Sequence, residues 1–333
     1  MDSLTHVALG AAVGIAAMGR RTAPWKAALW GAVCNTLPDL DVFIPHPDPV
    51  RDMTFHRAES HAFFWLTLAA PLLGWLAATL MQEGSQRGRW ILATWLALVA
   101  HPLLDALTVY GTQVALPFTD RPFGAGSVFI IDPLVTLPLV AGVLVALAGH
   151  HHASRWAGLG LALAVAYLGW GLGVQQHVRA LAEASLRQQG IAFERVLVTP
   201  TAFNTVLWRV VAMAPDAYHE GYHSLLDDGR GVAFERHDRG AALQPALAGN
   251  WAGQRMAWFS RGFYALDERD GRLAITDLRM GQWPYYMFRF VVAERGSGWH
   301  ETVPYADGRQ IPVEAGLQWL WRRMRGEPVP PPR

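Results

Sequence analysis

The sequence predicts an α-helical membrane domain of four to six transmembrane or half-membrane helices, residues 1–190, followed by a small β-rich soluble domain, residues 191–333. Two observations lead to this fold class. Hydrophobic residues make up 52% and charged residues 17% of the 333 residues, whereas about 25% of an ordinary soluble domain is charged. The charges are also uneven, because nearly charge-free runs lie between Ala62 and Trp170 and charged residues return after Gln175.

Four apolar segments are long enough to cross a bilayer core, which takes roughly 20 residues. They cover residues 61–82, 90–110, 129–149 and 155–174. Two shorter stretches, 4–19 and 24–37, are marginal for spanning alone and are expected as tilted or half-buried helices packed against the others. A signal peptide would place positive charge before its apolar stretch. Here Asp2 comes first and Arg20 and Arg21 follow, so the first helix is expected to be retained.

The charged loops predict how the chain is oriented in the membrane. If all six helices cross, one side carries most of the basic loop residues and the other side most of the acidic ones. The basic loop residues are Arg20, Arg21, Lys26, Arg87, Arg89 and Arg155. Because Lys and Arg favour cytoplasmic loops, we expect a multi-pass protein of a bacterial-type inner (plasma) membrane with its C-terminal domain on the periplasmic or external side.

From about Phe193 the chain has short, alternating, aromatic-rich runs separated by turn residues. This pattern predicts an antiparallel sheet of about five or six strands. The expected strands include 205–211, 256–264, 272–277 and 285–292. A short helix is expected near Val313–Met324, followed by a disordered Pro-rich tail, 328–333.

The strongest sign of chemistry is the run HisProLeuLeuAsp, residues 101–105, at the end of an apolar segment. Two residues four apart on a helix lie on one face, so His101 and Asp105 can reach the same metal ion. An ionisable pair at membrane depth is costly unless it is satisfied, which favours a functional site. The alternative is a His–Asp hydrogen bond that joins two helices.

Two carboxylates follow the second helix. Pro38 favours an extended or turn conformation before it, so Asp39 and Asp41, two residues apart, point the same way. Paired carboxylates suit divalent cations. The alternative is an Asx-type turn that ends the helix.

Three further histidines are candidate ligands. The spacing of His56 and His61 does not place both on one helical face, so one is expected in a loop and the other in the first turn of the next helix. Histidines at a membrane border without a ligand role are the alternative. His6, at the start of the first helix, is weak evidence for a metal site when taken alone.

The predicted topology places all these side chains on the external side. The candidate ligands are His6, Asp39, Asp41, His56, His61, His101 and Asp105. Such a set exceeds what one tetrahedral zinc needs, so we expect one or two divalent ions. Zinc is the first choice for mixed His and Asp ligands and manganese the second.

Several motifs in order carry a family resemblance. They are LeuThrHis (4–6), AsnThrLeuProAspLeuAsp (35–41), HisArgAlaGluSerHis (56–61), HisProLeuLeuAsp (101–105), TyrGlyThrGln (110–113), IleIleAspProLeu (130–134) and PheAsnThrValLeuTrpArg (203–209). With them the chain resembles the YdjM/YbcI-type membrane-bound metal-dependent hydrolase family, which is distantly similar to zinc-dependent phospholipase C. The resemblance implies a phosphoester-cleaving metal centre with a defined ligand set. That set is His6, Asp39 or Asp41, His61, His101 and Asp105.

The expected reaction is metal-assisted hydrolysis of a phosphoester or lipid-like substrate at the membrane surface. A bound metal lowers the pKa of water from about 15.7 toward about 7. Glu59, or whichever of Asp39 and Asp41 is not a ligand, would orient or deprotonate that water. Arg57 would stabilise charge on a phosphoryl group. Membrane lipids are the expected partners, and the net charge of +1 gives no indication of nucleic acid.

Two other functions stay open. One is a non-enzymatic membrane protein with a structural metal, whose β-rich domain is the working surface. The other is a metalloprotease, because the run 219–223 matches HisGluxxHis. Against it, Gly221 interrupts the required helix, and in a strand Glu220 would point away from both histidines. The three histidines at 150–152 are expected in a solvated cytoplasmic loop.

Overall fold

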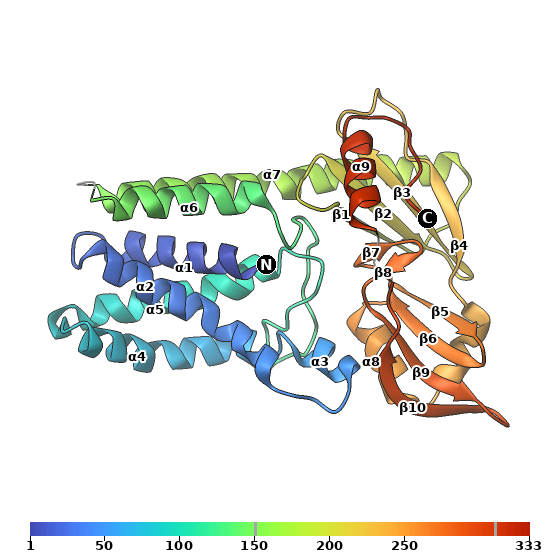
Figure 1. Cartoon of the computed structure of the whole chain (residues 1–333), viewed down its shortest axis with the longest axis horizontal. Helices are drawn as coiled ribbons and strands as arrows, with labels where there is room; N and C mark the ends of the chain where they lie inside the picture. Colours follow the sequence, from blue (N-terminus) through green and yellow to red (C-terminus); the bar gives the residue numbers. More distant parts are fainter. Residues whose placement is uncertain (150–151, 310–311) are drawn as a thin grey trace. The chain divides into compact units, whose positions relative to one another are not determined.

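A computed structural model of the chain describes residues 1–149, 152–309 and 312–333, so most of the expected loop at 150–152 lies outside the described residues (Figure 1). The chain divides into two compact units. The helical unit comprises Met1–Ile44 and His56–Leu172, and the β-rich unit comprises Pro45–Phe55 and Gly173–Arg333. The two units thus divide within one long helix, α7 (Ala153–Gln188), whereas the sequence predicts the domain boundary at residue 190.

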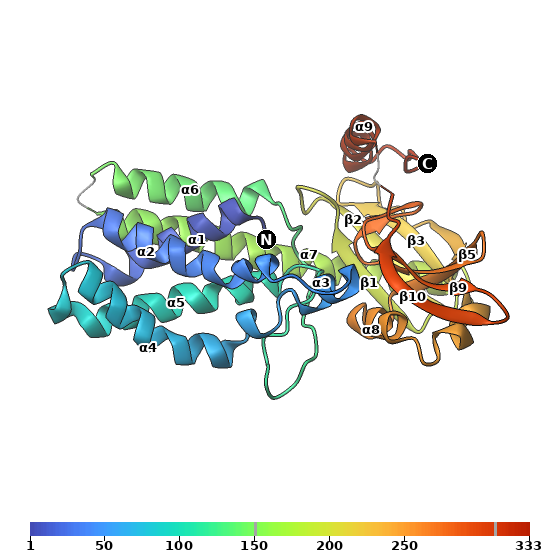
Figure 2. The ribbon, with the colours of Figure 1, turned by 60° about the horizontal axis from the view of Figure 1, so that its bottom comes forward.

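The helices of the helical unit lie side by side as a bundle (Figures 1 and 2). They are α1 (Ser3–Met18), α2 (Pro24–Thr36), α4 (Phe63–Leu80), α5 (Arg87–Asp105), α6 (Pro133–Leu147) and the first part of α7 (Ala153–Gln188). Three short 3-10 helices connect them, namely η1 (Leu37–Phe43), η2 (Glu59–His61) and η3 (Gly84–Gln86). The sequence-predicted helices are therefore present. Most ends differ by up to five residues from the prediction, whereas α7 continues fourteen residues past the predicted end at residue 174.

Glycines let α1 and α2 approach closely. A Cβ built on Gly10 would clash with the Gly31 carbonyl oxygen and would lie 2.5 Å from the Cβ of Asn35. A Cβ on Gly14 would likewise clash with the Ala27 carbonyl. Small residues at four-residue spacing permit such backbone contact between helices. The close packing brings His6, near the start of α1, next to the end of α2.

Two helices in the described part of the chain are long and apolar enough to cross a membrane, α4 with 18 residues and α7 with 36. Helices α1, α2 and α6 have 16, 13 and 15 residues. At 1.5 Å per residue they reach about 20–24 Å, which is less than the roughly 30 Å of a bilayer core. Helix α5 has 19 residues but carries charge at Arg87, Arg89 and Asp105. Four to six spans therefore remain a prediction.

The β-rich unit contains two four-stranded antiparallel sheets within the described residues. The first has the order β1 (Arg195–Pro200), β2 (Leu207–Met213), β3 (Ala217–Ser224), β4 (Phe234–Asp238). The second has the order β10 (Trp299–Ala306), β9 (Arg289–Arg295), β6 (Arg272–Asp277), β5 (Tyr264–Arg269). Strands β7 (Gly281–Gln282) and β8 (Tyr285–Tyr286) pair to form a two-stranded antiparallel ribbon. The expected single sheet of five or six strands is thus wrong.

Helices cover parts of both sheets. The second part of α7 packs Val174, Val178, Ala182 and Leu186, which are four residues apart, against β1 and β2. The remaining helical elements are α3 (Pro49–Phe55), η4 (Ala241–Leu247), α8 (Trp251–Phe259) and α9 (Val313–Met324). The sequence-predicted helix at α9 is confirmed.

One expected strand is a helix instead. The run 256–264 begins inside α8, where Asn250 caps the first turn by accepting a 2.7 Å hydrogen bond from the Gly253 amide. Ala252, Met256 and Phe259 are buried on one helical face. These side chains follow a helical period of three to four residues, but the aromatic residues between them give the sequence the appearance of a strand. The expected strands at 205–211 and 272–277 correspond to β2 and β6, and the run 285–292 is divided between β8 and β9.

Candidate metal centre

Four of the predicted ligands lie together in the helical unit. Asp39 comes from η1, His61 from η2, and His101 and Asp105 from the last turns of α5. Each offers one nitrogen or oxygen atom, and these atoms all lie within 4.8 Å of one another. His61, His101 and Asp105 are fully buried, whereas the side chain of Asp39 is 24% exposed.

The distances between these atoms fit a tetrahedral ion. The Nε2 atoms of His61 and His101 are 3.0 Å apart, and each lies 3.3 Å from Asp39 Oδ1. They lie 3.5 and 3.3 Å from Asp105 Oδ2. A tetrahedron with metal–ligand bonds of about 2.0–2.1 Å has edges of about 3.3–3.4 Å. Five of the six separations are therefore close to those that a zinc ion requires, and the sixth, between the Asp39 and Asp105 oxygens, is within 4.8 Å.

Two of these atoms have no hydrogen-bond partner in the described part of the chain. Asp39 Oδ1 and Asp105 Oδ2 are buried and accept no hydrogen bond. Leaving a buried acceptor unsatisfied costs roughly 1–3 kcal/mol, and more for a charged group. Burial by itself would raise the pKa of Asp39, but the neighbouring His101 and His61 side chains hold that pKa well below its ordinary value. The site thus offers anionic oxygen that a cation would satisfy.

Hydrogen bonds at the far nitrogens turn the imidazoles inward. His101 Nδ1 donates to the Asn35 carbonyl at 2.5 Å, and His6 Nδ1 lies 3.1 Å from the Asn35 side-chain oxygen. The Asn35 amide nitrogen donates in turn to the Ala97 carbonyl at 2.6 Å, which fixes the direction of that oxygen. Since Nδ1 then carries the proton, the Nε2 lone pairs of His6 and His101 face the cluster. Metal-binding histidines are oriented in this way.

His61 is held by a similar relay. Its Nδ1 lies 2.8 Å from Ser60 Oγ, which donates to Asp41 Oδ2 at 2.6 Å. Asp41 also lies 2.7 Å from His56 Nδ1 and accepts a 3.0 Å hydrogen bond from the Arg57 amide. Burial alone would raise the pKa of Asp41, and His56 lowers it below its ordinary value. Asp41 and His56 therefore connect η1 to the loop before η2, outside the group of four.

His6 adjoins the cluster. Its ring stacks on that of His101 with centroids 3.7 Å apart, and its Nε2 lies 3.3 Å from Asp105 Oδ1. The amino group of Met1 also donates to this oxygen. His6 thus contacts two of the four candidate ligands, Asp105 and His101, from outside the group.

The two residues predicted to assist the reaction occupy different surroundings. Arg57 is buried, has a left-handed backbone with φ of 64°, and places its Nε 3.3 Å from Asp105 Oδ2. Its guanidinium also lies over the Tyr110 ring, 5.0 Å from the centroid. Glu59 is exposed in η2. Arg57 therefore adds positive charge directly beside the cluster, whereas Glu59 lies at the surface, at the start of the helix η2 that carries His61.

Sequence reasoning assigned no role to Asn35 and Ser60. Asn35 is fully buried at the end of an apolar helix, and a polar side chain in such a position was the available signal. Nothing in the local sequence marks Ser60, because its role depends on the distance between η1 and η2.

The sequence pattern of the YdjM inner membrane protein family matches residues 1–178, which is more than half of the chain and includes every candidate ligand. The chain belongs to the YdjM family. The two helices capable of crossing a membrane agree with an inner-membrane protein of this family.

This YdjM-family chain is also similar to "Uncharacterized protein YfhP" of Bacillus subtilis (strain 168). The two are 24% identical over 231 residues, which cover 66% of this chain and 68% of the relative. No solved structure matches the chain. The resemblance stated from the motifs is therefore confirmed at the level of the family.

Proposed function

We propose that this YdjM-family protein is a membrane-bound metal-dependent hydrolase that acts on a phosphoester or lipid-like substrate at the membrane surface. One observation supports the proposal most strongly. Two histidine nitrogens and two unsatisfied carboxylate oxygens converge at separations suited to one divalent ion. Zinc is the preferred ion for this mixed donor set, and manganese is the second choice.

Asp39, His61, His101 and Asp105 would hold the ion, and His6 would support it. A bound divalent ion supplies an activated water and polarises the bond to be cleaved. Asn35 and Ser60 keep the imidazole lone pairs directed at the site. Arg57 would bind an anionic phosphoryl oxygen, and Glu59 would accept a proton at the exposed side of η2.

A substrate-turnover assay on detergent-purified protein tests this proposal. Asp105→Asn keeps the shape of the side chain and removes the charge that holds the ion, so hydrolysis of a chromogenic phosphoester or phospholipid should fall at least about 10²-fold. Asp120→Asn, an exposed acidic residue in the same unit, is the matched control and should keep full activity. Equal activity of the two variants would contradict a catalytic role for the cluster.

The second candidate function is a structural metal site without catalysis. Four protein ligands complete a tetrahedron, and three of them are fully buried, as in closed structural zinc sites. This candidate predicts a tightly held ion, no turnover of any ester, and a lower melting temperature after chelation.

The metalloprotease pattern has less support. The run 219–223 lies in strand β3, and Glu220 is bound by Arg209, so the helix that this pattern requires is not formed there. A multi-pass topology with an external C-terminal unit completes the main proposal. Alkaline phosphatase fused after residue 333 should then be active, and an inactive fusion would reverse the orientation.

A further inference from the structure

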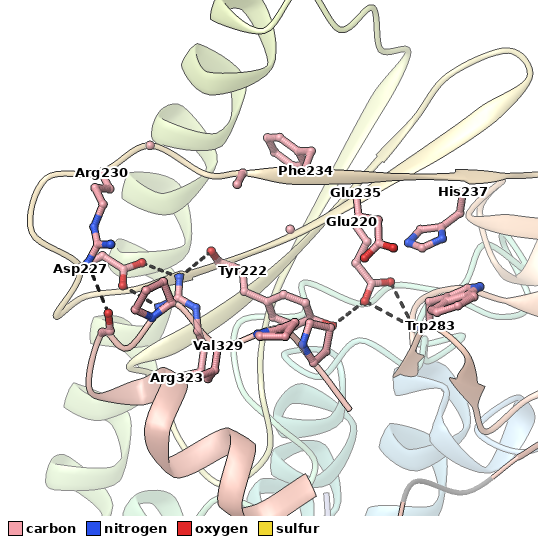
Figure 3. A pocket seen from close by; sticks show the side chains of 17 residues that line it. Glu220, Tyr222, Asp227, Arg230, Phe234, Glu235, His237, Trp283, Arg323 and Val329 are labelled. Atoms are coloured by element: carbon pink, nitrogen blue, oxygen red, sulfur yellow. Dashed lines mark hydrogen bonds and ion pairs between the residues drawn. The ribbon is translucent and has the colours of Figure 1, made fainter. Parts of the chain in front are cut away.

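The β-rich unit contains a cavity of about 440 Å³ on one face of its first sheet. Figure 3 shows Glu220, Glu235, His237 and Trp283 at one end, and Asp227, Arg230 and Arg323 at the other. The Pro-rich tail, residues 328–333, forms one wall through its residues 328–331. A volume of this size falls in the range of roughly 300–1,000 Å³ typical of ligand sites.

The strand register places two carboxylates opposite each other in this cavity. Glu220 on β3 pairs with Glu235 on β4. Like charges directly opposite are unfavourable unless each has a counter-charge. Glu220 is paired with Arg209 at 2.7 Å, and both are buried. It also accepts hydrogen bonds from the Tyr222 and Tyr286 hydroxyls at 2.5 and 3.0 Å. Among the described residues, Glu235 forms no ion pair with a cationic side chain of the sheet.

Arg333 of the tail supplies the counter-charge to Glu235. Its Nη2 lies 2.5 Å from Glu235 Oε1, and its guanidinium carbon lies 5.2 Å from the centre of the Trp283 ring. That indole also stacks with His237, with ring centroids 5.0 Å apart and an angle of 20° between the rings. A carboxylate beside an aromatic face is a two-point site for a cation. The tail therefore behaves as a ligand of this site.

Weak contacts hold the tail. The Trp319 indole donates to the Val329 carbonyl at 3.2 Å. The side chains of Arg333 and Glu235 are 58% and 42% exposed, and exposed ion pairs contribute little stability. Four prolines remove the amide donors that could pair with the edge strand β4. The tail was expected to be disordered, whereas the structure places it in the cavity through contacts that a competitor could replace.

We propose that this cavity is a recognition site for a proline-rich segment of a partner protein that carries a guanidinium side chain, and that the tail occupies the site as an intramolecular competitor. Proline-rich segments adopt the extended polyproline conformation before binding and lose little entropy when bound. The proposal does not depend on metal binding or on hydrolysis. It assigns an interaction surface to the β-rich unit.

Binding of a labelled peptide to the full-length protein in detergent tests the proposal. The probe is acetyl-ValProProProArg-amide, and its matched control carries Gln in place of Arg. A short tether gives an intramolecular competitor an effective concentration of about millimolar. Arg333→Ala should therefore increase the affinity for the Arg peptide by at least about threefold, whereas Arg325→Ala, an exposed residue after α9, should leave it unchanged.

Two further changes test the site itself in the Arg333→Ala background. Glu235→Gln and Trp283→Ala should each weaken binding of the Arg peptide by roughly 2- to 30-fold, because each removes one of the two contacts to the guanidinium. Glu235 is at the surface, so its substitution reports on binding even if Trp283→Ala perturbs the fold. Equal affinity for the Arg and Gln peptides, or binding that is unaffected by Glu235→Gln, would overturn the proposal.

Discussion

The two units of this protein bury charge in opposite ways. In the helical unit, Asp39 and Asp105 each direct a buried oxygen toward two imidazole nitrogens, and this oxygen has no hydrogen-bond partner among the described residues. In the β-rich unit, both oxygens of buried Glu220 accept hydrogen bonds from Arg209 and from tyrosine hydroxyls. A satisfied buried carboxylate stabilises a particular packing, whereas an unsatisfied one is suited to bind a cation.

The largest effect should follow from removing ligands of the cluster. A double change of His101→Ala and Asp105→Ala should remove at least one divalent ion from the purified protein, because it removes one of the two histidine ligands and one of the two carboxylate ligands. Inductively coupled plasma mass spectrometry measures the metal content and tests this prediction. Unchanged metal content in the double variant would mean that the ion, if any, is bound elsewhere.

Breaking the Glu220 network should instead destabilise the β-rich unit without affecting metal. Arg209→Ala leaves a buried carboxylate without its cation, which costs about 3–5 kcal/mol in the free energy of unfolding. Arg236→Ala removes an exposed pair with Asp216 and should cost about 0–1 kcal/mol. Denaturant unfolding followed by near-ultraviolet circular dichroism compares the two variants, and similar losses of stability would contradict the distinction.

The sequence predicted the cluster better than its surroundings. The spacing of His101 and Asp105 needs only helical geometry, and both lie one turn apart with their atoms 3.3 Å from each other. The role of Asn35 requires knowing that α1, α2 and α5 meet at one point. Glycine contacts account for the approach of α1 to α2, but the position of α5 depends on the packing of the whole bundle. The prediction of a strand at 256–264 is wrong for its first half. Aromatic residues favour strands, but the Asn250 cap stabilises helix α8 there instead.

Asn35 should have an intermediate effect on the metal centre. It receives the Nδ1 proton of His6 on its side chain and that of His101 on its carbonyl, so Asn35→Ala releases His6 and loosens α5. Loss of such supporting hydrogen bonds typically weakens metal affinity about 10- to 100-fold. Thr36→Ala, which removes a hydroxyl that donates to the Ala32 carbonyl within α2, is the matched control. Zinc titration in competition with a chelating dye measures both, and equal affinities would show that Asn35 does not position the ligands.

The smallest expected effect is a dependence of stability on pH that belongs to Glu220. Burial would raise the pKa of Glu220, but the charge of Arg209 and its hydrogen bonds hold that pKa below its ordinary value. A carboxyl with a lower pKa in the folded state than in the unfolded state binds fewer protons when folded. Its contribution to stability is therefore complete above the unfolded pKa of about 4.3 and is lost as the pH falls through the folded value.

In the wild type, the melting temperature of the β-rich unit should thus decrease as the pH is lowered from about 4 to below the folded pKa of Glu220. Glu220→Gln cannot titrate, so this variant should be less stable at neutral pH and should lose less on acidification. Melting curves that shift equally in the two proteins would assign the acid sensitivity to other carboxylates.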